Sequence, residues 1–339
     1  MATRSPTEIP QGAIRFNTDS QKMEFYAQDQ WWEMATDVPT LDGGARGFVS
    51  GGLSSGSEIN NIDMITIPTT GNAIDFGNLT QQSRLGGTCA SRTRAIRMGG
   101  IIPGPSVTTT IDYWTMSKKD DAVSFSTLET GQRSTSGLSN ETRGICAAGV
   151  PDNEKIQYIT IASLGAAKDF GNLSQNRTQA SGISNPTRGL FAGGEAPSRV
   201  NTIDYINIAS TGNAHDFGDI TREISGIVCV GNSTRGMFGA GEFPSTFDST
   251  IDYVTIATKG NASHFGELTF SYRLGGTASS PIRGVFMGGT NDSPSSNTVY
   301  NTIQYITLAS EGNAVDFGDL TTSFGYAHIG NCSNAHGGL

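Results

Sequence analysis

The tripeptide Asp-Phe-Gly is the motif in this sequence that most resembles a catalytic element, because its aspartate binds magnesium in protein kinases. Four copies begin at Asp75, Asp169, Asp216 and Asp316. A kinase also needs a glycine-rich phosphate loop and an H-R-D segment, and neither accompanies these copies. Since the copies recur at multiples of one spacing, we interpret the tripeptide as part of a repeated strand.

Metal or cofactor binding is not predicted. The histidines come from different positions of a repeat and form no H-x-x-x-H pair: His215, His264, His328 and His336. The cysteines have no C-x-x-C spacing and fall within predicted strands, where we expect free, buried thiols: Cys89, Cys146, Cys229 and Cys332.

Hydrolytic chemistry is not predicted either, so the chain is not expected to be an enzyme. A glycosidase needs two carboxyl groups placed across the scissile bond. Acidic residues such as Glu195, Glu242 and Glu267 fall in predicted loops or at strand ends, and we interpret them as solvated charges.

The elements that carry these residues form an internal repeat of about 47 residues. Its copies begin near residues 46, 94, 143, 188, 235 and 283, where an arginine is followed by glycine, or by Ala95 in the second copy. A period of this length is typical of propeller blades and longer than that of most helical solenoids. Each copy contains four short β-rich segments bounded by turn residues, which predicts a four-stranded antiparallel blade.

The predicted fold is therefore all-β: a six-bladed β-propeller preceded by a small N-terminal β meander. Repeated aromatic residues should fill the space between blades, namely Tyr113, Tyr158, Tyr205, Tyr253 and Tyr305 with Phe76, Phe125, Phe170, Phe217, Phe265 and Phe317. The first repeat lacks its first strand, so we expect residues 324–331 to supply it and to close the ring.

The repeated arginine and the aspartate of the I-D-Y pattern are candidates for a ring of ion pairs. The expected pairs are Arg94 with Asp112 and Arg235 with Asp252. Such a ring could line a polar channel, but recurrence in most blades favours a scaffold role.

Composition excludes several partners. The net charge of −9, without a cluster of Lys and Arg, argues against nucleic acid. No apolar run is long enough for a membrane span, and the N-terminus lacks the apolar region of a signal peptide. We therefore expect no membrane insertion and no export by the general secretory route.

Residues 1–40 do not repeat, whereas residues 41–339 form the predicted propeller domain. Three predicted strands at 12–19, 22–26 and 30–34 are too small to be stable alone and need a partner. An attachment role would use Phe16, Phe25, Tyr26, Trp31 and Trp32. The alternative is that Trp31 and Trp32 pack beneath the propeller of the same chain.

Binding is expected on the propeller face that carries the most variable loops, at 53–60, 101–109, 150–155, 195–200, 242–249 and 290–300. Phe243, Phe247 and Tyr300 are candidate ligand-binding residues there, as exposed aromatic side chains able to stack on sugar rings or on protein. The alternative is that these loops vary without a binding role.

Two resemblances suggest a biological context. The order of small-residue strand, strand ending in Gly-Gly, strand with Tyr and strand with an aromatic resembles the kelch repeat over residues 42–332, with Phe in place of the usual Trp. The segment G-A-I-R-F-N-T-D-S…K-M-E-F-Y…W is similar to small β-modules of bacteriophage fibre and virion-surface proteins, and with the Asn-rich repeats the chain resembles virion proteins of cyanophages or marine phages.

The phage resemblance implies a structural protein on the virion surface, made in the host cytoplasm. Its N-terminal module would contact other virion proteins, homotrimers would be possible, and the propeller would bind a host glycan or receptor. The alternatives are a head or tail decoration protein with only structural contacts, and a polysaccharide depolymerase.

Overall fold

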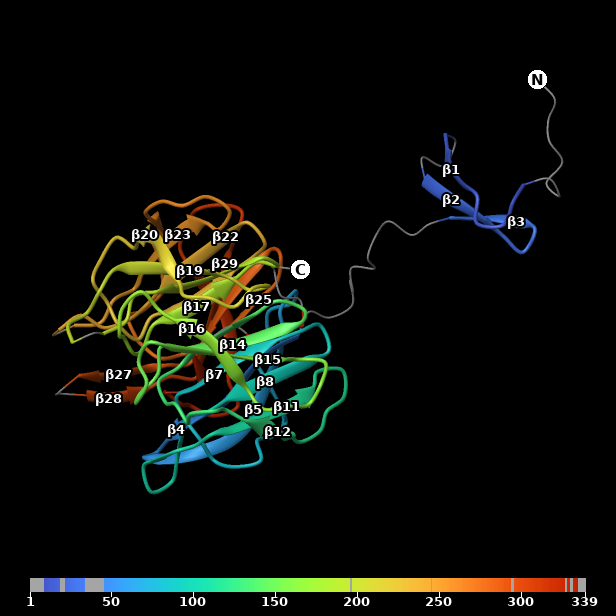
Figure 1. The fold of residues 1–339 in the computed structure, drawn as a ribbon. Helices are drawn as coiled ribbons and strands as arrows, with labels where there is room; N and C mark the ends of the chain where they lie inside the picture. Colours follow the sequence, from blue (N-terminus) through green and yellow to red (C-terminus); the bar gives the residue numbers. More distant parts are fainter. Residues whose placement is uncertain are drawn as a thin grey trace. The chain divides into compact units, whose positions relative to one another are not determined.

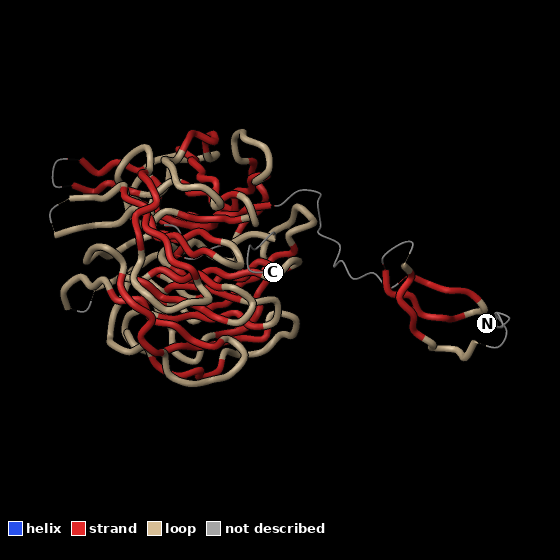
Figure 2. Tube along the Cα trace, turned by 90° about the horizontal axis from the view of Figure 1, so that it is seen from above, coloured by secondary structure: helices blue, strands red, loops and turns tan. Residues whose placement is uncertain are grey.

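A computed structural model describes residues 9–18, 22–33, 46–195, 197–244, 246–293, 296–326, 328–329 and 332–334. All regular structure in these residues is β-strand, as the sequence predicts (Figure 2). Since the described residues form no helix, none of them contributes a helical membrane span. The chain divides into two compact units, Met1–Gly43 and Gly44–Leu339.

The small unit contains a three-stranded antiparallel meander (Figure 1). Its strands are β1 (Ile14–Asn17), β2 (Lys22–Ala27) and β3 (Gln30–Glu33), in the spatial order β1-β2-β3. Phe25 lies opposite Ile14 on one side and opposite Trp32 on the other.

The large unit has a β-propeller-like architecture of successive antiparallel sheets (Figure 1). Its first sheet has the order β4-β5-β6, and its second β12-β11-β8-β7-β31. The third to sixth sheets have four strands each, in the orders β13-β14-β15-β16, β17-β18-β19-β20, β21-β22-β23-β24 and β25-β26-β29-β30. Two hairpins, β9-β10 and β27-β28, extend from loops.

The strand bounds follow the repeat of the sequence. In the first three sheets and the first hairpin they are β4 (Arg46–Ser54), β5 (Ser57–Thr66), β6 (Ile74–Asn78), β7 (Gly86–Ala90), β8 (Arg94–Met98), β9 (Ile101–Ile102), β10 (Ser106–Val107), β11 (Thr110–Thr115), β12 (Val123–Thr127), β13 (Ser136–Ser139), β14 (Arg143–Ala147), β15 (Lys155–Thr160) and β16 (Lys168–Asn172). The remaining strands are β17 (Ser181–Ser184), β18 (Arg188–Ala192), β19 (Thr202–Asn207), β20 (His215–Asp219), β21 (Val228–Gly231), β22 (Arg235–Gly239), β23 (Thr250–Thr255), β24 (Ser263–Glu267), β25 (Gly276–Ser279), β26 (Arg283–Met287), β27 (Thr290–Ser293), β28 (Ser296–Val299), β29 (Thr302–Thr307), β30 (Val315–Asp319) and β31 (His328–Ile329).

The Asp-Phe-Gly tripeptide is a β-bulge in the outermost strand of a sheet. In β5 and β6, Ile62 lies opposite Gly77 and Asp63 opposite Asp75, so Phe76 between them has no partner. The same register shift recurs in the other sheets. The bulge turns the phenyl ring into the core, where Phe76 is buried. This confirms the tripeptide as a strand element.

Apolar clusters fill the space between consecutive sheets. One cluster combines Ile96 and Met98 of the second sheet with Cys146 and Ile159 of the third. The repeated tyrosine packs edge-on against the phenylalanine of its own sheet, at 5.9 Å between ring centroids for Tyr113 and Phe125. The four cysteines are free and buried, as predicted. Burial raises the pKa of the Cys146 and Cys229 thiols to about 12, so both stay protonated at neutral pH.

Glycine is required where the innermost strands of neighbouring sheets meet. A Cβ atom on Gly137 of β13 would lie 2.1 Å from the carbonyl oxygen of Thr88 in β7. The sequence therefore places small residues in these strands because the two backbones approach within van der Waals contact.

The C-terminal segment contacts both the first and the second sheet. Ser333 bridges to Gly47 of β4, and the Phe48 amide donates a 2.9 Å hydrogen bond to the Cys332 carbonyl oxygen. Within the segment expected to lie beside β4, His328 and Ile329 pair in parallel with β7 instead. Residues 327, 330 and 331 of that predicted strand lie outside the described residues.

Candidate functional site

The repeated arginine does not pair with the aspartate of its own repeat, so the expected pairs Arg94–Asp112 and Arg235–Asp252 are wrong. Arg94 Nη1 donates to the carbonyl oxygens of Ile161 (2.8 Å) and Ala162 (3.1 Å) at the end of a strand in the next sheet. Its guanidinium also lies 4.9 Å from the ring centroid of Tyr113. These carbonyls follow the last ladder residue of their strand, and the arginine supplies the donor that the ladder lacks.

The same contact recurs from sheet to sheet. Arginine Nη1 donates to a strand-end carbonyl in the pairs Arg46–Met116, Arg143–Ile208, Arg188–Ile256, Arg235–Leu308 and Arg283–Ile67. The last pair connects the sixth sheet with the first, at 3.0 Å. This recurrence supports a scaffold role for the arginines.

The repeated aspartate bonds the preceding sheet instead. Asp112 accepts hydrogen bonds from the backbone amide (3.2 Å) and the hydroxyl (2.7 Å) of Thr80, and Asp63 accepts the equivalent bonds from Thr321. Gln304 replaces the aspartate without losing the contact, because its Oε1 accepts from Thr269. Burial raises the pKa of Asp63 and Asp112 despite these hydrogen bonds.

The three aromatic residues expected to be exposed on the variable loops are half-buried. Phe243 packs against a core cluster that contains Ile224 and Ile227. Tyr300 lies 4.4 Å from Phe270 between ring centroids, and the Arg273 guanidinium lies 5.9 Å from the ring of Phe247. Phe243 and Tyr300 pack at the margin of the core, so part of each ring is covered. Their role in ligand binding stays a prediction.

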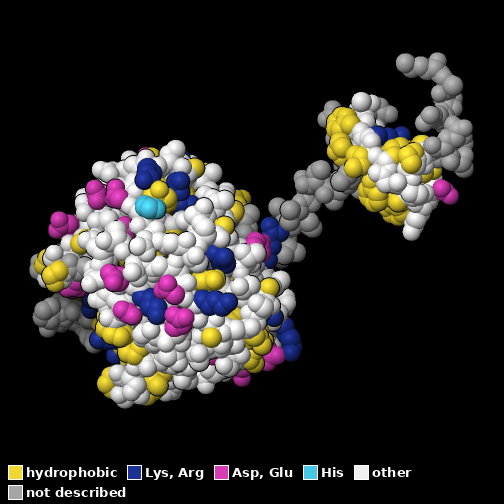
Figure 3. All heavy atoms as spheres, viewed as in Figure 1, with side chains coloured by type: hydrophobic (Ala, Val, Ile, Leu, Met, Phe, Trp, Pro, Cys, Tyr) yellow, Lys and Arg dark blue, Asp and Glu magenta, His cyan; other side chains and the backbone are white. Residues whose placement is uncertain are grey.

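A basic and aromatic cluster near these loops has its charges already neutralised. Arg84 and Arg273 flank the ring of Tyr326, at 5.6 and 5.7 Å from its centroid. Arg84 forms an ion pair with Glu58 at 3.2 Å, and Arg273 forms one with Glu242. Figure 3 likewise shows basic and acidic side chains interspersed on the visible face of the large unit. The cluster therefore offers no unpaired cation to an anionic ligand.

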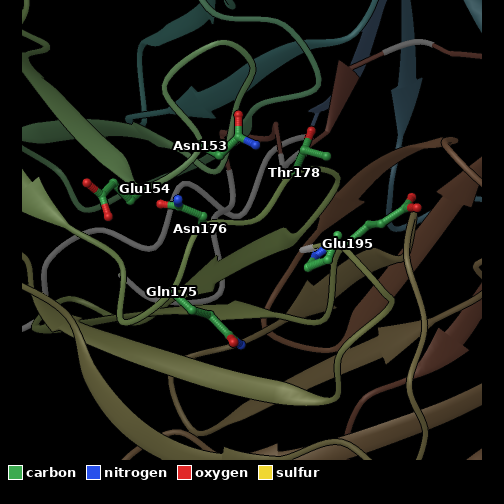
Figure 4. Close-up of a pocket in the computed structure, with 7 residues that line it drawn as sticks. Asn153, Glu154, Gln175, Asn176, Thr178 and Glu195 are labelled. Atoms are coloured by element: carbon green, nitrogen blue, oxygen red, sulfur yellow. The ribbon is translucent and has the colours of Figure 1, made fainter.

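A polar pocket of about 690 Å³ opens between the third and fourth sheets. Its lining residues are Asn153, Glu154, Gln175, Asn176, Thr178, Glu195 and Pro197, all from loops (Figure 4). In this view Glu154 and Glu195 lie on opposite sides of Asn176. Asn153 Oδ1 and Thr178 Oγ1 are shielded from solvent and have no hydrogen-bond partner.

Sequence reasoning missed this pocket and interpreted its Glu195 as a solvated charge. The polar run Ser174–Gln175–Asn176–Arg177–Thr178 gave no signal. Two residues before the positive-φ residue of each repeat, Arg177 has polar counterparts in the earlier repeats, Ser83 and Gln132, and apolar or aromatic ones in the later repeats, Ile224, Tyr272 and Phe324.

The small unit has one uncharged apolar face. Strand alternation places Ile14, Phe16, Met23, Phe25 and Trp32 on the same side of the meander. Their exposed fractions are 60, 57, 36, 37 and 43 %. Figure 3 shows hydrophobic side chains gathered on the visible side of the small unit.

The opposite face of the meander is satisfied internally. Glu24 accepts hydrogen bonds from Arg15 Nε (2.7 Å) and Asn17 Nδ2 (2.8 Å), and the Arg15 guanidinium lies 4.2 Å from the Trp31 ring centroid. Tyr26 is buried and meets Trp31 edge-on at 5.3 Å. The predicted attachment residues therefore separate: Phe16, Phe25 and Trp32 are exposed on one face, while Tyr26 and Trp31 pack on the other.

Residues Gly52 to Gly56 match the G-x-S-x-G pattern of hydrolase nucleophiles, but the geometry differs. That motif requires a strand followed by a sharp turn and a helix. Here the segment is the hairpin between β4 and β5, and Ser54 Oγ donates to the Ser323 carbonyl oxygen at 2.9 Å. The pattern therefore has a structural role.

Among the described residues, no group of three or more His, Cys, Asp or Glu side chains could hold a metal ion. The chain matches no known family model and no curated protein sequence.

Proposed function

We propose that this protein is a structural protein of the phage virion surface, which attaches through its N-terminal unit and uses the propeller to bind a host glycan or receptor. The observation that carries the proposal is the uncharged apolar face of the small unit. Side chains of this size leave water readily, and contiguous apolar patches on a soluble unit are typical of protein contact sites. The resemblance of the N-terminal segment to phage fibre modules suggests which proteins would cover it.

The finer fold that we propose is a closed six-bladed kelch-like propeller with four strands per blade. The contacts between the sixth and first sheets support closure, since Arg283 reaches Ile67 and Thr321 reaches Asp63 as their counterparts do elsewhere. In the proposed ring, the C-terminal segment supplies the strand missing beside β4. Closure would leave no innermost strand edge open to pair with other chains.

Virion labelling tests the proposed location. An antibody against the large unit should label intact particles in electron micrographs, on head, tail or fibre. The proposal would be contradicted if virions purified from a lysate that contains the protein did not carry it.

Substitutions on the apolar face test attachment. Phe16→Ser combined with Trp32→Ser should reduce incorporation into virions at least tenfold, because the partner would then cover polar groups. Leu164→Ser is a matched control, since Leu164 is a 62 % exposed apolar residue of the large unit. Normal incorporation of the double variant would instead favour packing of the meander on its own chain.

Oligomeric state and catalysis separate the remaining alternatives. Sedimentation of the full chain should give a trimer if the apolar faces also contact one another. Incubation with host surface polysaccharide should release no oligosaccharide, and release would favour a depolymerase. A decoration protein with only structural contacts would label virions but bind no host surface material.

A further inference from the structure

The pocket between the third and fourth sheets is built from three loops. Asn153 and Glu154 precede β15, Gln175, Asn176 and Thr178 lie between β16 and β17, and Glu195 follows β18. The pocket thus belongs to the variable loops at 150–155 and 195–200 together with one connection between sheets.

The backbone under these side chains is fixed by hydrogen bonds. Thr178 and Glu195 exchange both of their backbone hydrogen bonds, at 3.0 and 2.9 Å. The Leu173 amide donates to the Glu154 carbonyl oxygen at 2.8 Å. This bond holds the loop before β15 against the connection between β16 and β17. The loop backbone therefore needs little rearrangement when a ligand binds.

Two of the polar atoms lack partners that folding normally supplies. Asn153 Oδ1 and Thr178 Oγ1 are shielded from solvent without a hydrogen bond, an arrangement that costs about 1–3 kcal/mol for each group. Because solvent does not reach these two atoms, ligand contacts fall to the accessible carboxylates of Glu154 and Glu195. Carboxylate oxygens accept hydrogen bonds from ligand hydroxyl and amide groups.

The charge of the pocket selects against anions. Glu154 and Glu195 have no ion pair among the described residues, whereas the neighbouring cations are occupied: Lys155 pairs with Glu129 at 3.2 Å, and fully buried Arg177 pairs with Asp204 at 2.9 Å. A sulfate or carboxylate would enter next to two unpaired carboxylates, which repel it.

The glutamate at the equivalent position of the next border, between the fourth and fifth sheets, is in a different charge environment. There Glu242 follows β22 as Glu195 follows β18, but Arg199 (2.9 Å) and Arg273 both form ion pairs with it. The acceptors of Glu242 are therefore already used, while those of Glu195 are free for a ligand.

We infer that this pocket binds an uncharged glycan, through hydroxyl or acetamido groups that donate to Glu154 and Glu195 and accept from the amides of Gln175 and Asn176. The inference rests on the proposed function and specifies its ligand class and location. Because no aromatic ring lines the pocket, hydrogen bonds and not ring stacking orient the sugar.

The test uses the labelled full chain on an array of oligosaccharides: neutral hexose oligomers, N-acetylglucosamine oligomers, uronate oligomers and sulfated heparin fragments. Signal is expected on one of the neutral classes. Asn176→Ala and Gln175→Ala should each lower it at least fivefold. The matched control is Glu223→Ala, which changes the exposed residue at the position equivalent to Asn176 in the next repeat.

Each other result overturns the inference in a distinguishable way. Neutral-glycan signal that the pocket variants do not change moves the site elsewhere and leaves the proposed function intact. Signal on uronate or sulfated oligomers alone refutes the charge argument. No signal on any glycan refutes glycan binding, while virion labelling independently decides whether the protein is on the particle.

Discussion

Two kinds of region occur at the borders between sheets of the large unit, and they differ in whether their charged side chains have partners. The arginine, aspartate and glutamine side chains that recur in the repeats find partners in a neighbouring sheet, as Arg188 does at the Ile256 carbonyl oxygen. At the pocket between the third and fourth sheets, Glu195 and Asn153 Oδ1 have none among the described residues. Recurring polar residues therefore stabilise the scaffold, and the unpaired glutamates mark the candidate site.

The largest effect is expected where two innermost backbones meet. Gly137→Ala should lower the free energy of unfolding by about 3 kcal/mol, because its Cβ would lie 2.1 Å from the Thr88 carbonyl oxygen. Urea unfolding measures the change. The control Gly165→Ala has no heavy atom within 4 Å of the new Cβ and should be neutral. Equal stability of both variants would refute the close approach.

A smaller loss is expected for a recurring arginine. Arg188→Ala removes hydrogen bonds to the Ile256 (2.7 Å) and Ala257 (3.0 Å) carbonyl oxygens and should cost about 2 kcal/mol. Arg133→Ala is the matched control, since Arg133 is exposed and its side chain forms no hydrogen bond or ion pair among the described residues. Thermal unfolding of the two variants should differ clearly, and coincident curves would contradict a scaffold role.

A stabilising change is expected where alanine takes the place of glycine in the repeat. Ala148 has a φ of 61°, a left-handed conformation that L-residues adopt at a cost. Ala148→Gly should therefore raise the free energy of unfolding by about 0.5 kcal/mol. This is the net effect, because the greater entropy of glycine in the unfolded chain offsets part of the relieved strain. The reverse change, Gly99→Ala, should destabilise, because its Cβ would lie 2.4 Å from the Gln132 carbonyl oxygen.

The recurring aspartate gives a pH-dependent effect. Burial raises the pKa of Asp63 above its ordinary value, so the folded state binds this proton more tightly than the unfolded state does. The contribution of Asp63 to stability therefore falls as pH rises from the unfolded pKa through the raised folded pKa. Asp63→Asn should remove that part of the slope and preserve the contact, as Gln304 does naturally. Parallel stability profiles of variant and parent between pH 3 and 8 would argue against it.

The smallest effect on stability is expected in the pocket. Asn176→Ala should change the free energy of unfolding by less than about 0.5 kcal/mol, because this exposed side chain forms no hydrogen bond among the described residues. The same variant should lose glycan signal on the array. Together with Arg188→Ala, it tests whether scaffold and site are separable. A large loss of stability in Asn176→Ala would show that they are not.

Several features were predictable from the sequence because they depend on local pattern. The strands, the repeat and the buried cysteines follow from periodicity, and the Asp-Phe-Gly tripeptide was recognised as structural from its spacing. The partner of Arg94 was not predictable, since it is a backbone carbonyl 67 residues away whose sequence identity carries no signal. The half-burial of Phe243 and Tyr300 likewise depends on core side chains from other repeats.

The sequence by itself determined the all-β class, the repeated strand pattern and the amphipathic character of the meander, because alternation and turn chemistry act between neighbouring residues. Only the tertiary structure decided which polar groups are satisfied. Glu195 and Glu242 are both glutamates at equivalent positions after the second strand of their sheets. Glu242 has Arg199 and Arg273 within ion-pair distance, and Glu195 has no such partner among the described residues, because the side chains that the folded loops bring to each border differ.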